Sequence, residues 1–337
     1  MIPSPGREEL YFRHQLSHQQ IDELLGENRS AEYPASKAQY LSILNAFNVV
    51  TGLFESEAIE FIPQKGPMLS YRLYGDPIYR AYNDLDFLIR TENIPDAVEL
   101  LMRNGFHSPF YRFPEDNCRR KLLLRHTNEL FLRSPALDAG VELHWSMFNA
   151  RITSTAEHDR LLAENKMTIN FNGKNYKVLK EELELLFLVI HGGMHAWGKL
   201  KWLLDIVVFL EKCPFDQDTF LLLTRKLKAQ RMVALCNSML IRWFPGTRLL
   251  PSEGVAPLFL ERFAKKQASM PDRKKSVKEH LAFFAYTWSA FPGARYKLDL
   301  VCRNLYATDL ADVGWLPCFA PAYYVVSPFR KLLRGFR

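Results

Sequence analysis

Two aspartates separated by one residue open the apolar run Asp84-Leu85-Asp86-Phe87-Leu88-Ile89. The alternation of polar and apolar residues predicts a β-strand, in which side chains two apart share a face. At a rise of about 3.3 Å per residue, the carboxylates of Asp84 and Asp86 lie about 7 Å apart and can converge on one hard cation. Such a pair suits phosphoryl transfer, where Mg²⁺ takes oxygen ligands and bridges triphosphate oxygens.

A third carboxylate comes from the run Val141-Glu142-Leu143-His144-Trp145. In a strand, Glu142 and His144 share one face, and the three apolar residues point into the core. If this strand lies beside residues 84–90, Glu142 joins the aspartates, either as a metal ligand or as the acceptor of a hydroxyl proton.

Asp-x-Asp alone is a weak signal, and the chain has a second copy at Asp216-Gln217-Asp218. That copy follows Cys213-Pro214 at the expected start of a helix, where acids serve as caps. The first copy opens an apolar strand, a costly place for two like charges unless a cation compensates them. The alternative is a strand end open to water, with Arg80 or Arg90 neutralising the pair.

Basic residues near the aspartates are candidates for phosphate contacts. Lys65 and Gly66 stand before the strand, and there Lys65 either meets a β- or γ-phosphate or is an exposed loop lysine. Arg80 either binds phosphate or pairs with the aspartates.

A helical periodicity places four further residues, His191, His195, Lys199 and Trp202, on one expected helix face. One hypothesis is that this face borders the site, with Lys199 or Lys201 on phosphate and Trp197 or Trp202 stacked on a base. The other is an interdomain packing face. Gly192-Gly193 inside the helix indicates close approach by a ligand or another backbone. A zinc site is not expected, because Gly192 stands where H-E-x-x-H has its Glu.

The composition is that of an ordinary globular protein of 337 residues, 48% of them hydrophobic, with a net charge of +7. Five scattered cysteines argue against a disulfide framework. No secretory signal and no stretch of the ~18 to 20 apolar residues that span a bilayer are present, so we expect a cytoplasmic protein. The basic cluster at 273–278 is read as a solvated helix start, and no specific nucleic-acid binding is expected.

The pattern of polar and apolar residues divides the chain into an α+β half and a helical half. Helices are expected at 8–26 and 37–57, with Ser36 as the cap of the second, and at 93–104, ending at Gly105. Strand-like runs follow at 59–62, 84–90, 121–126, 128–133 and 141–145, with a hairpin turning at Asn172-Gly173. From Lys180 onward helices are expected near 180–212, 217–229, 231–244, 255–268, 277–290 and 295–306.

This organisation predicts four parts: N-terminal helices (1–58), an α+β domain with a small mixed sheet (59–179), a helical domain (180–312) and an apolar, basic tail (313–337). The tail fits either a helix in a membrane interface or a final core segment. We favour the core segment, because Pro317, Pro321 and Pro328 break up a long amphipathic helix.

The sequence resembles a bacterial group of uncharacterised nucleotidyltransferases in the DNA polymerase β-like superfamily at Lys65-Gly66, Tyr74, Arg80, Asp84-Leu85-Asp86-Phe87-Leu88-Ile89 and Val141-Glu142-Leu143-His144-Trp145. The resemblance covers roughly residues 40 to 215, and includes His191-Gly192-Gly193-Met194-His195-Ala196-Trp197. It implies a small mixed sheet flanked by helices, with Asp84, Asp86 and Glu142 as catalytic and metal-binding carboxylates. The implied reaction uses Mg²⁺ or Mn²⁺ and transfers a nucleoside monophosphate from an NTP such as ATP to a hydroxyl of a small molecule, glycan precursor or protein.

The sequence departs from the group at Gly66, which is followed by Pro67 where the superfamily has Gly or Ser. Proline removes a backbone N–H donor from the loop that approaches the triphosphate, which shifts phosphate contacts to Lys65 and Arg80. This departure keeps a second hypothesis open, a non-catalytic nucleotide sensor or assembly subunit.

Overall fold

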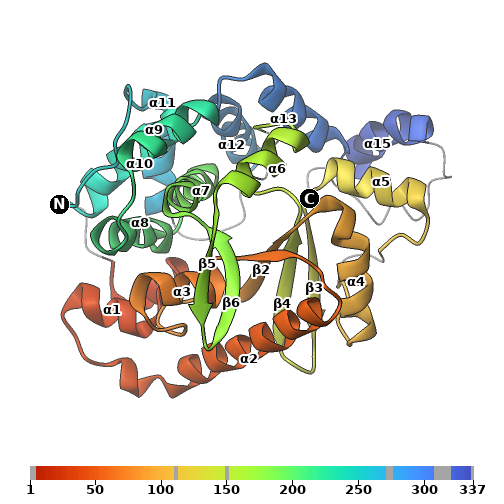
Figure 1. Ribbon diagram of the computed structural model, residues 1–337. Helices are drawn as coiled ribbons and strands as arrows, with labels where there is room; N and C mark the ends of the chain where they lie inside the picture. The colour runs from red at the N-terminus through yellow and green to blue at the C-terminus, as the bar shows by residue number, and fades with distance from the viewer. Residues whose placement is uncertain (1–4, 110–112, 149–151, 271–275, 307–319, 335–337) are drawn as a thin grey trace.

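The computed structural model describes residues 5–109, 113–148, 152–270, 276–306 and 320–334. Residues 313–319 of the tail and most of the basic cluster 273–278 lie outside these ranges. The fold is α+β, as predicted, with a small mixed sheet and many helices (Figure 1). The strands are β1 (Phe61–Gln64), β2 (Asp84–Ile89), β3 (Glu129–Ser134), β4 (Ala139–His144), β5 (Lys166–Phe171) and β6 (Lys174–Leu179). The helices of the N-terminal half are α1 (His18–Leu25), α2 (Pro34–Ser56), α3 (Gly66–Tyr74), α4 (Ile94–Arg103), α5 (Asn117–His126) and α6 (Thr155–Glu164). Those of the C-terminal half are α7 (Glu181–Met194), α8 (Leu200–Lys212), α9 (Gln217–Lys226), α10 (Gln230–Trp243), α11 (Leu258–Ser269), α12 (Val277–Ala290), α13 (Ala294–Tyr306) and α15 (Ala320–Arg334).

Four strands form the main sheet in the order β1-β2-β4-β3, and β5 and β6 form a separate hairpin. The strand β2 is antiparallel to β1 and parallel to β4, so the two strands expected to carry the carboxylates are neighbours. One face of the sheet packs on α2, which runs along that side of the molecule in Figure 1. There the ring of Phe87 from β2 contacts the rings of Phe47 and Phe54 from α2, with centroids 5.8 and 5.4 Å apart.

The opposite face of the sheet looks toward the C-terminal helices. Ile62 of β1 and Leu88 of β2 are opposite one another and belong to the same buried cluster as residues of α7, α8 and α10. Because side chains alternate along a strand, Asp84 and Asp86 share this face with Leu88. The carboxylates therefore point into the space between the sheet and the helices.

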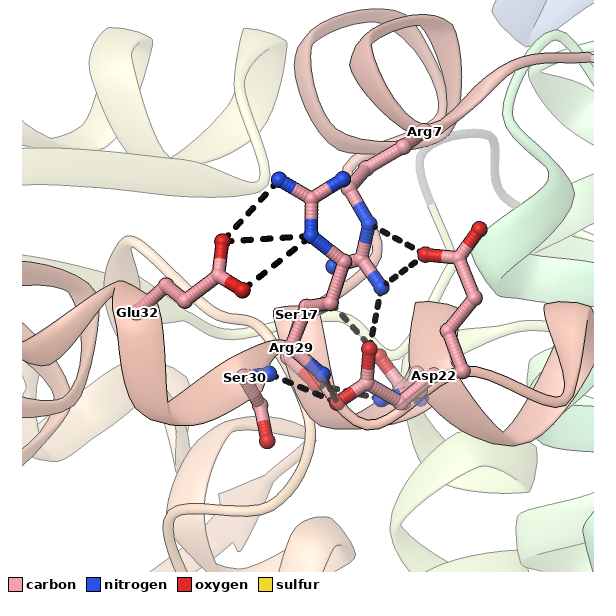
Figure 2. Close-up of polar contacts among 8 residues, drawn as sticks. Arg7, Ser17, Asp22, Arg29, Ser30 and Glu32 are labelled. Carbon is pink, nitrogen blue, oxygen red and sulfur yellow. Dashed lines mark hydrogen bonds and ion pairs between the residues drawn. The ribbon is translucent and has the colours of Figure 1, made fainter.

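Polar contacts join residues of the N-terminal segment to one another (Figure 2). The carboxylate of Asp22 binds the guanidinium of Arg7 and accepts backbone N–H bonds from Arg29 and Ser30 at 2.9 and 2.7 Å. Further along, the backbone N–H of Leu200, at the start of α8, donates to Nδ1 of the buried His14 at 3.2 Å. This last bond places the residues around position 15 beside α8.

Four local predictions are wrong. The expected helix 8–26 is a five-residue π-helix, Glu9–Arg13, followed by α1, which Ser17 caps by accepting from the N–H of Gln20. Residues 121–126 are helical, because Asp116 caps α5 by accepting from the N–H of Arg119. The expected helix 180–212 is two helices, since Ala196 and Trp197 adopt left-handed backbone angles, with φ of +50° and +51°, between α7 and α8. Ser36 does not cap α2, which begins at Pro34.

The glycine of α4 and the acids of α9 are as predicted. Gly105 follows the end of α4 with φ of +83°, and Asp216 caps α9 by accepting from the N–H of Thr219 at 2.8 Å. The second Asp-x-Asp copy is therefore a helix cap.

The described part of the tail forms a helix, which corrects the expectation that prolines prevent one. Pro328 stands inside α15. The helix lies beside α5 and α13 (Figure 1), where Tyr323 is buried against Leu122 and the hydroxyl of Tyr324 lies 2.9 Å from Nε2 of His126. Within the described ranges, no helix combines the length and hydrophobicity that crossing a membrane requires.

Candidate active site

The register of two strands brings the expected carboxylates together. Asp86 of β2 lies directly opposite Glu142 of the parallel strand β4, and Asp84 lies opposite Gly140. All three acids line one cavity of about 250 Å³ between the sheet and the helices α7 and α8. The alternation read from the sequence and the pairing of β2 with β4 together produce this convergence.

Ligand atoms suited to a metal ion cluster on Asp86, Glu142 and His144, all within 4.8 Å of one another. His144 follows Glu142 by two residues on the same face of β4, as the alternation predicts. Asp84, the remaining expected ligand, lines the same cavity but is not a member of this cluster.

Two cations of the protein already contact Asp86. Nζ of Lys65 lies 2.8 Å from its Oδ1, and Nε2 of His144 lies 3.1 Å from the same oxygen. His144 also approaches Glu142, at 3.3 Å, and Glu129 of β3, at 3.6 Å from Nδ1. Burial favours neutral His144, but its bonds to Asp86 and Glu142 outweigh this and raise its pKa to about 9. Burial likewise opposes the Asp86 carboxylate, but Lys65 and His144 hold its pKa well below the usual range.

Asp84 is the carboxylate whose charge is least compensated. Burial, together with the nearby charges of Asp86 and Glu142, raises its pKa to about 6, while Lys65 and Lys201 oppose the rise. A half-buried carboxylate with a raised pKa beside two other acids is the electrostatic signature of a site that gains from an added cation.

The turn between β1 and α3 forms one rim of the cavity. Lys65 and Gly66 both have φ of +49°, a left-handed conformation that favours glycine. Gly66 begins α3, and Pro67 occupies its first turn. The side chain of Lys65, expected on phosphate, turns toward Asp86.

Arg80 is anchored by a residue 125 positions away. Its Nε and Nη2 donate to Oδ1 and Oδ2 of Asp205 at 2.7 and 2.8 Å, and both side chains are almost fully buried. The carboxylate that binds Arg80 is therefore Asp205 of α8, and not Asp84 or Asp86. Arg80 still contributes to the cavity wall.

The wall facing the carboxylates comes from the end of α7 and the start of α8. It consists of His191, His195, Lys199, Lys201 and Trp202. The rings of His195 and Trp202 stack, with centroids 5.0 Å apart, and Nζ of Lys199 lies 5.7 Å from the Trp202 ring centroid. Burial and the nearby charges of Arg80 and Lys199 lower the pKa of Lys201 to about 7.

The residues of this wall do not lie along one helix, as the periodicity predicted. They line the same cavity from both sides of the break between α7 and α8. Trp197, one of two candidates for base stacking, is wholly buried. Its ring fills the space where a Cβ on Gly192 would lie, 2.2 Å away, and the sulfur of Met232 lies 2.7 Å from the corresponding position on Gly193. The two glycines thus accommodate protein side chains and not a ligand.

Six lining residues were not found from the sequence: Gln15, Gln64, Tyr82, Glu129, Met147 and Phe187. Glu129 stands opposite His144 in the β3–β4 pairing, and the alternation of residues 128–133 could have placed it on this face. Gln64 immediately precedes Lys65 at the end of β1. For Gln15, which comes from the N-terminal segment with φ of +53°, the sequence carries no comparable signal.

The sequence matches the model of a known protein family. The family model described as "uncharacterised nucleotidyltransferase" matches residues 11–245. Among solved structures, the chain is similar to an antigenic nucleotidyltransferase-like protein from Paracoccidioides brasiliensis, at 18% identity over 56% of this chain and 88% of that one, with a TM-score of 0.32. No curated protein matches the sequence.

Proposed function

This chain belongs to the family of uncharacterised nucleotidyltransferases, and from that premise we propose that it is a metal-dependent enzyme. The donor in this proposal is a nucleoside triphosphate, and the acceptor is a hydroxyl of a small molecule, a glycan precursor or a protein. The observation that carries the proposal is the pairing of Asp86 with Glu142 in one cavity that also holds Asp84 and three lysines, Lys65, Lys199 and Lys201.

The residues present fit a divalent cation. Asp86 and Glu142 offer oxygen ligands, His144 offers a nitrogen, and Asp84 adds a further, only partly compensated carboxylate in the same cavity. A bound Mg²⁺ or Mn²⁺ would neutralise phosphate charge and polarise the α-phosphate. In the absence of a metal, Lys65 and His144 supply the positive charge around Asp86.

The basic wall suits the donor. The ammonium groups of Lys199 and Lys201 face the acidic wall across the cavity, which lets the negatively charged triphosphate lie between the two walls. Trp202, already stacked on His195, presents an aromatic ring to the same space for a base. Arg80, held by Asp205, lines the same cavity.

In the proposed reaction the acceptor oxygen attacks the α-phosphorus in line with the leaving group. The bond from that phosphorus to the oxygen bridging the β-phosphate breaks, and pyrophosphate leaves with that bond's electron pair. The carboxylate of Glu142 either takes the hydroxyl proton or binds the cation, while Lys65 balances charge on Asp86.

The test compares Asp86→Asn with Asp216→Asn, the matching change in the second Asp-x-Asp copy, where asparagine also caps a helix well. Each purified protein is incubated with labelled NTPs, Mg²⁺ and cell extract, and labelled product and pyrophosphate are followed. We expect at least a hundredfold loss for Asp86→Asn, in proportion to losses on removing a key electrostatic group, and wild-type turnover for Asp216→Asn. Equal turnover in all proteins would contradict the proposal, and NTP binding without pyrophosphate release would favour a nucleotide sensor.

A further inference from the structure

Gln64 carries a buried donor that no described residue satisfies. The side chain is 4% exposed, and its Nε2 has no hydrogen-bond partner within the described ranges. Gln64 stands directly opposite Asp86 in the antiparallel pairing of β1 with β2. Residues opposite one another project their side chains to the same face, with Cβ atoms about 5 Å apart. The amide therefore lies on the cavity side of the sheet, where Gln64 is one of the lining residues.

An unsatisfied buried amide is costly. A buried donor without an acceptor costs about 1–3 kcal/mol. The chain does satisfy a comparable amide elsewhere: Nδ2 of Asn237, 8% exposed, donates to the carbonyl of Leu250 at 2.9 Å, and its Oδ1 accepts from the N–H of Leu250 at 2.9 Å. Several other buried polar atoms of the described residues also have no partner, but Gln64 lines the cavity of the candidate site, where a bound ligand would bring an acceptor.

The position of Gln64 indicates which part of a ligand it meets. It precedes the turn of Lys65 and Gly66, from which the nine-residue helix α3 begins. The first turn of a helix offers free N–H groups and a positive dipole end to anions. Pro67 removes one of those donors. A phosphate bound at this rim of the cavity would lack a hydrogen bond that the Gln64 amide is placed to give.

We propose that Gln64 is a phosphate-binding residue, and that its Nε2 donates to a triphosphate oxygen in place of the N–H that Pro67 lacks. This inference rests on the proposed function, because it deepens the same nucleotide site. It also accounts for the departure from the family pattern at Gly66-Pro67: the missing backbone donor of Pro67 is replaced by a side-chain donor three residues earlier, at the end of β1.

The variant Gln64→Met removes the donor and keeps the length and burial of the side chain. Calorimetry with Mg²⁺ and three probes locates the loss: the NTP that wild type binds, inorganic tripolyphosphate, and the matching nucleoside. We expect about tenfold weaker binding of NTP and tripolyphosphate, unchanged binding of the nucleoside, and a melting temperature of the ligand-free variant equal to or above that of wild type.

The matched control is Asn237→Leu, which removes a satisfied buried amide. It should lower the melting temperature and leave NTP affinity unchanged. If wild type binds NTP and Gln64→Met binds it equally well, or if Gln64→Met melts well below wild type, the phosphate-binding role of Gln64 is wrong and the proposed function stands. If wild type binds no NTP with any divalent cation, the proposed function itself fails.

Discussion

Nζ of Lys65 lies 2.8 Å from Oδ1 of Asp86, so an ammonium group of the protein binds the carboxylate that is central to the candidate site. Lys65 reaches this position from a left-handed backbone conformation at the end of β1. A divalent cation that binds Asp86 must therefore compete with, or share the carboxylate with, a cation built into the chain.

Removing that ammonium should tighten metal binding. In Lys65→Met we expect the affinity for Mn²⁺ without nucleotide to rise about tenfold, because two like charges near one carboxylate repel. Electron paramagnetic resonance of free Mn²⁺ measures this directly. The control is Lys166→Met, which breaks the exposed pair of Lys166 with Glu60. Equal or weaker Mn²⁺ binding by Lys65→Met would show that Lys65 does not compete for Asp86.

Asp84 should make the metal-free protein less stable at neutral pH. Its pKa of about 6 exceeds the ordinary 3.8, so the folded chain binds this proton more tightly than the unfolded chain. The stabilisation that comes from the protonated Asp84 is fully present below pH 3.8 and is lost as pH rises through 6. Asp84→Asn should therefore raise the melting temperature by about 2–5 °C at pH 8 and hardly change it at pH 3.8.

Differential scanning fluorimetry in a chelating buffer measures the effect across that range. Asp138→Asn is the control, because Asp138 is exposed and pairs only with the exposed Arg133 among described residues. A melting temperature that falls in Asp84→Asn at pH 8 would mean that the Asp84 charge is already compensated in the metal-free protein.

Lys201 should make nucleotide binding depend on pH near neutrality. Its pKa is lowered to about 7, so the empty site loses this charge as pH rises above 7. Affinity for NTP should fall between pH 6.5 and 8.5 in wild type, whereas Lys201→Met should bind weakly with a flatter pH profile. Calorimetry on both proteins measures the two pH profiles, and because the NTP ionises equally in both experiments, the difference between the profiles is due to Lys201. If the affinities of wild type and Lys201→Met change in parallel with pH, Lys201 does not contact the phosphates.

Arg80 and Asp205 should behave as one buried pair. Replacing Asp205 with Ala leaves the guanidinium of Arg80 buried without its partner, at a cost of about 3–5 kcal/mol in the free energy of unfolding. The double variant Arg80→Met/Asp205→Leu should recover much of that loss. Chemical denaturation of wild type, both single variants and the double variant measures the coupling. Additive losses would show that the two residues act independently.

The sequence predicted the placement of side chains correctly where the alternation along a strand determines which face each residue occupies. Asp84 with Asp86, and Glu142 with His144, share faces because strand side chains alternate, and only the pairing of their strands had to be supplied by the fold. Asp216 was distinguished as a cap by its place before a helix.

Some contacts and helix boundaries could not be predicted from the sequence pattern. Nothing near Arg80 marks Asp205 as its partner, 125 residues away. The break between α7 and α8 is local but unmarked in the sequence: Ala196 and Trp197 have positive φ although neither is glycine, and the Trp197 ring packs on Gly192, five residues earlier. Leucines 122 and 123 fit a strand or a helix equally well, and the cap at Asp116 settles which one forms.

One buried cluster contains Ile62 and Leu88 of the sheet, Leu16 of the N-terminal segment and residues of α7, α8 and α10. Hinged enzymes close by rotating two separately packed bodies across a wet cleft, and here the two walls of the cavity share a single hydrophobic interior. Substrate entry in this protein would then depend more on side chains that line the cavity, such as the exposed His195 and the half-buried Lys199, than on rotation of one wall against the other.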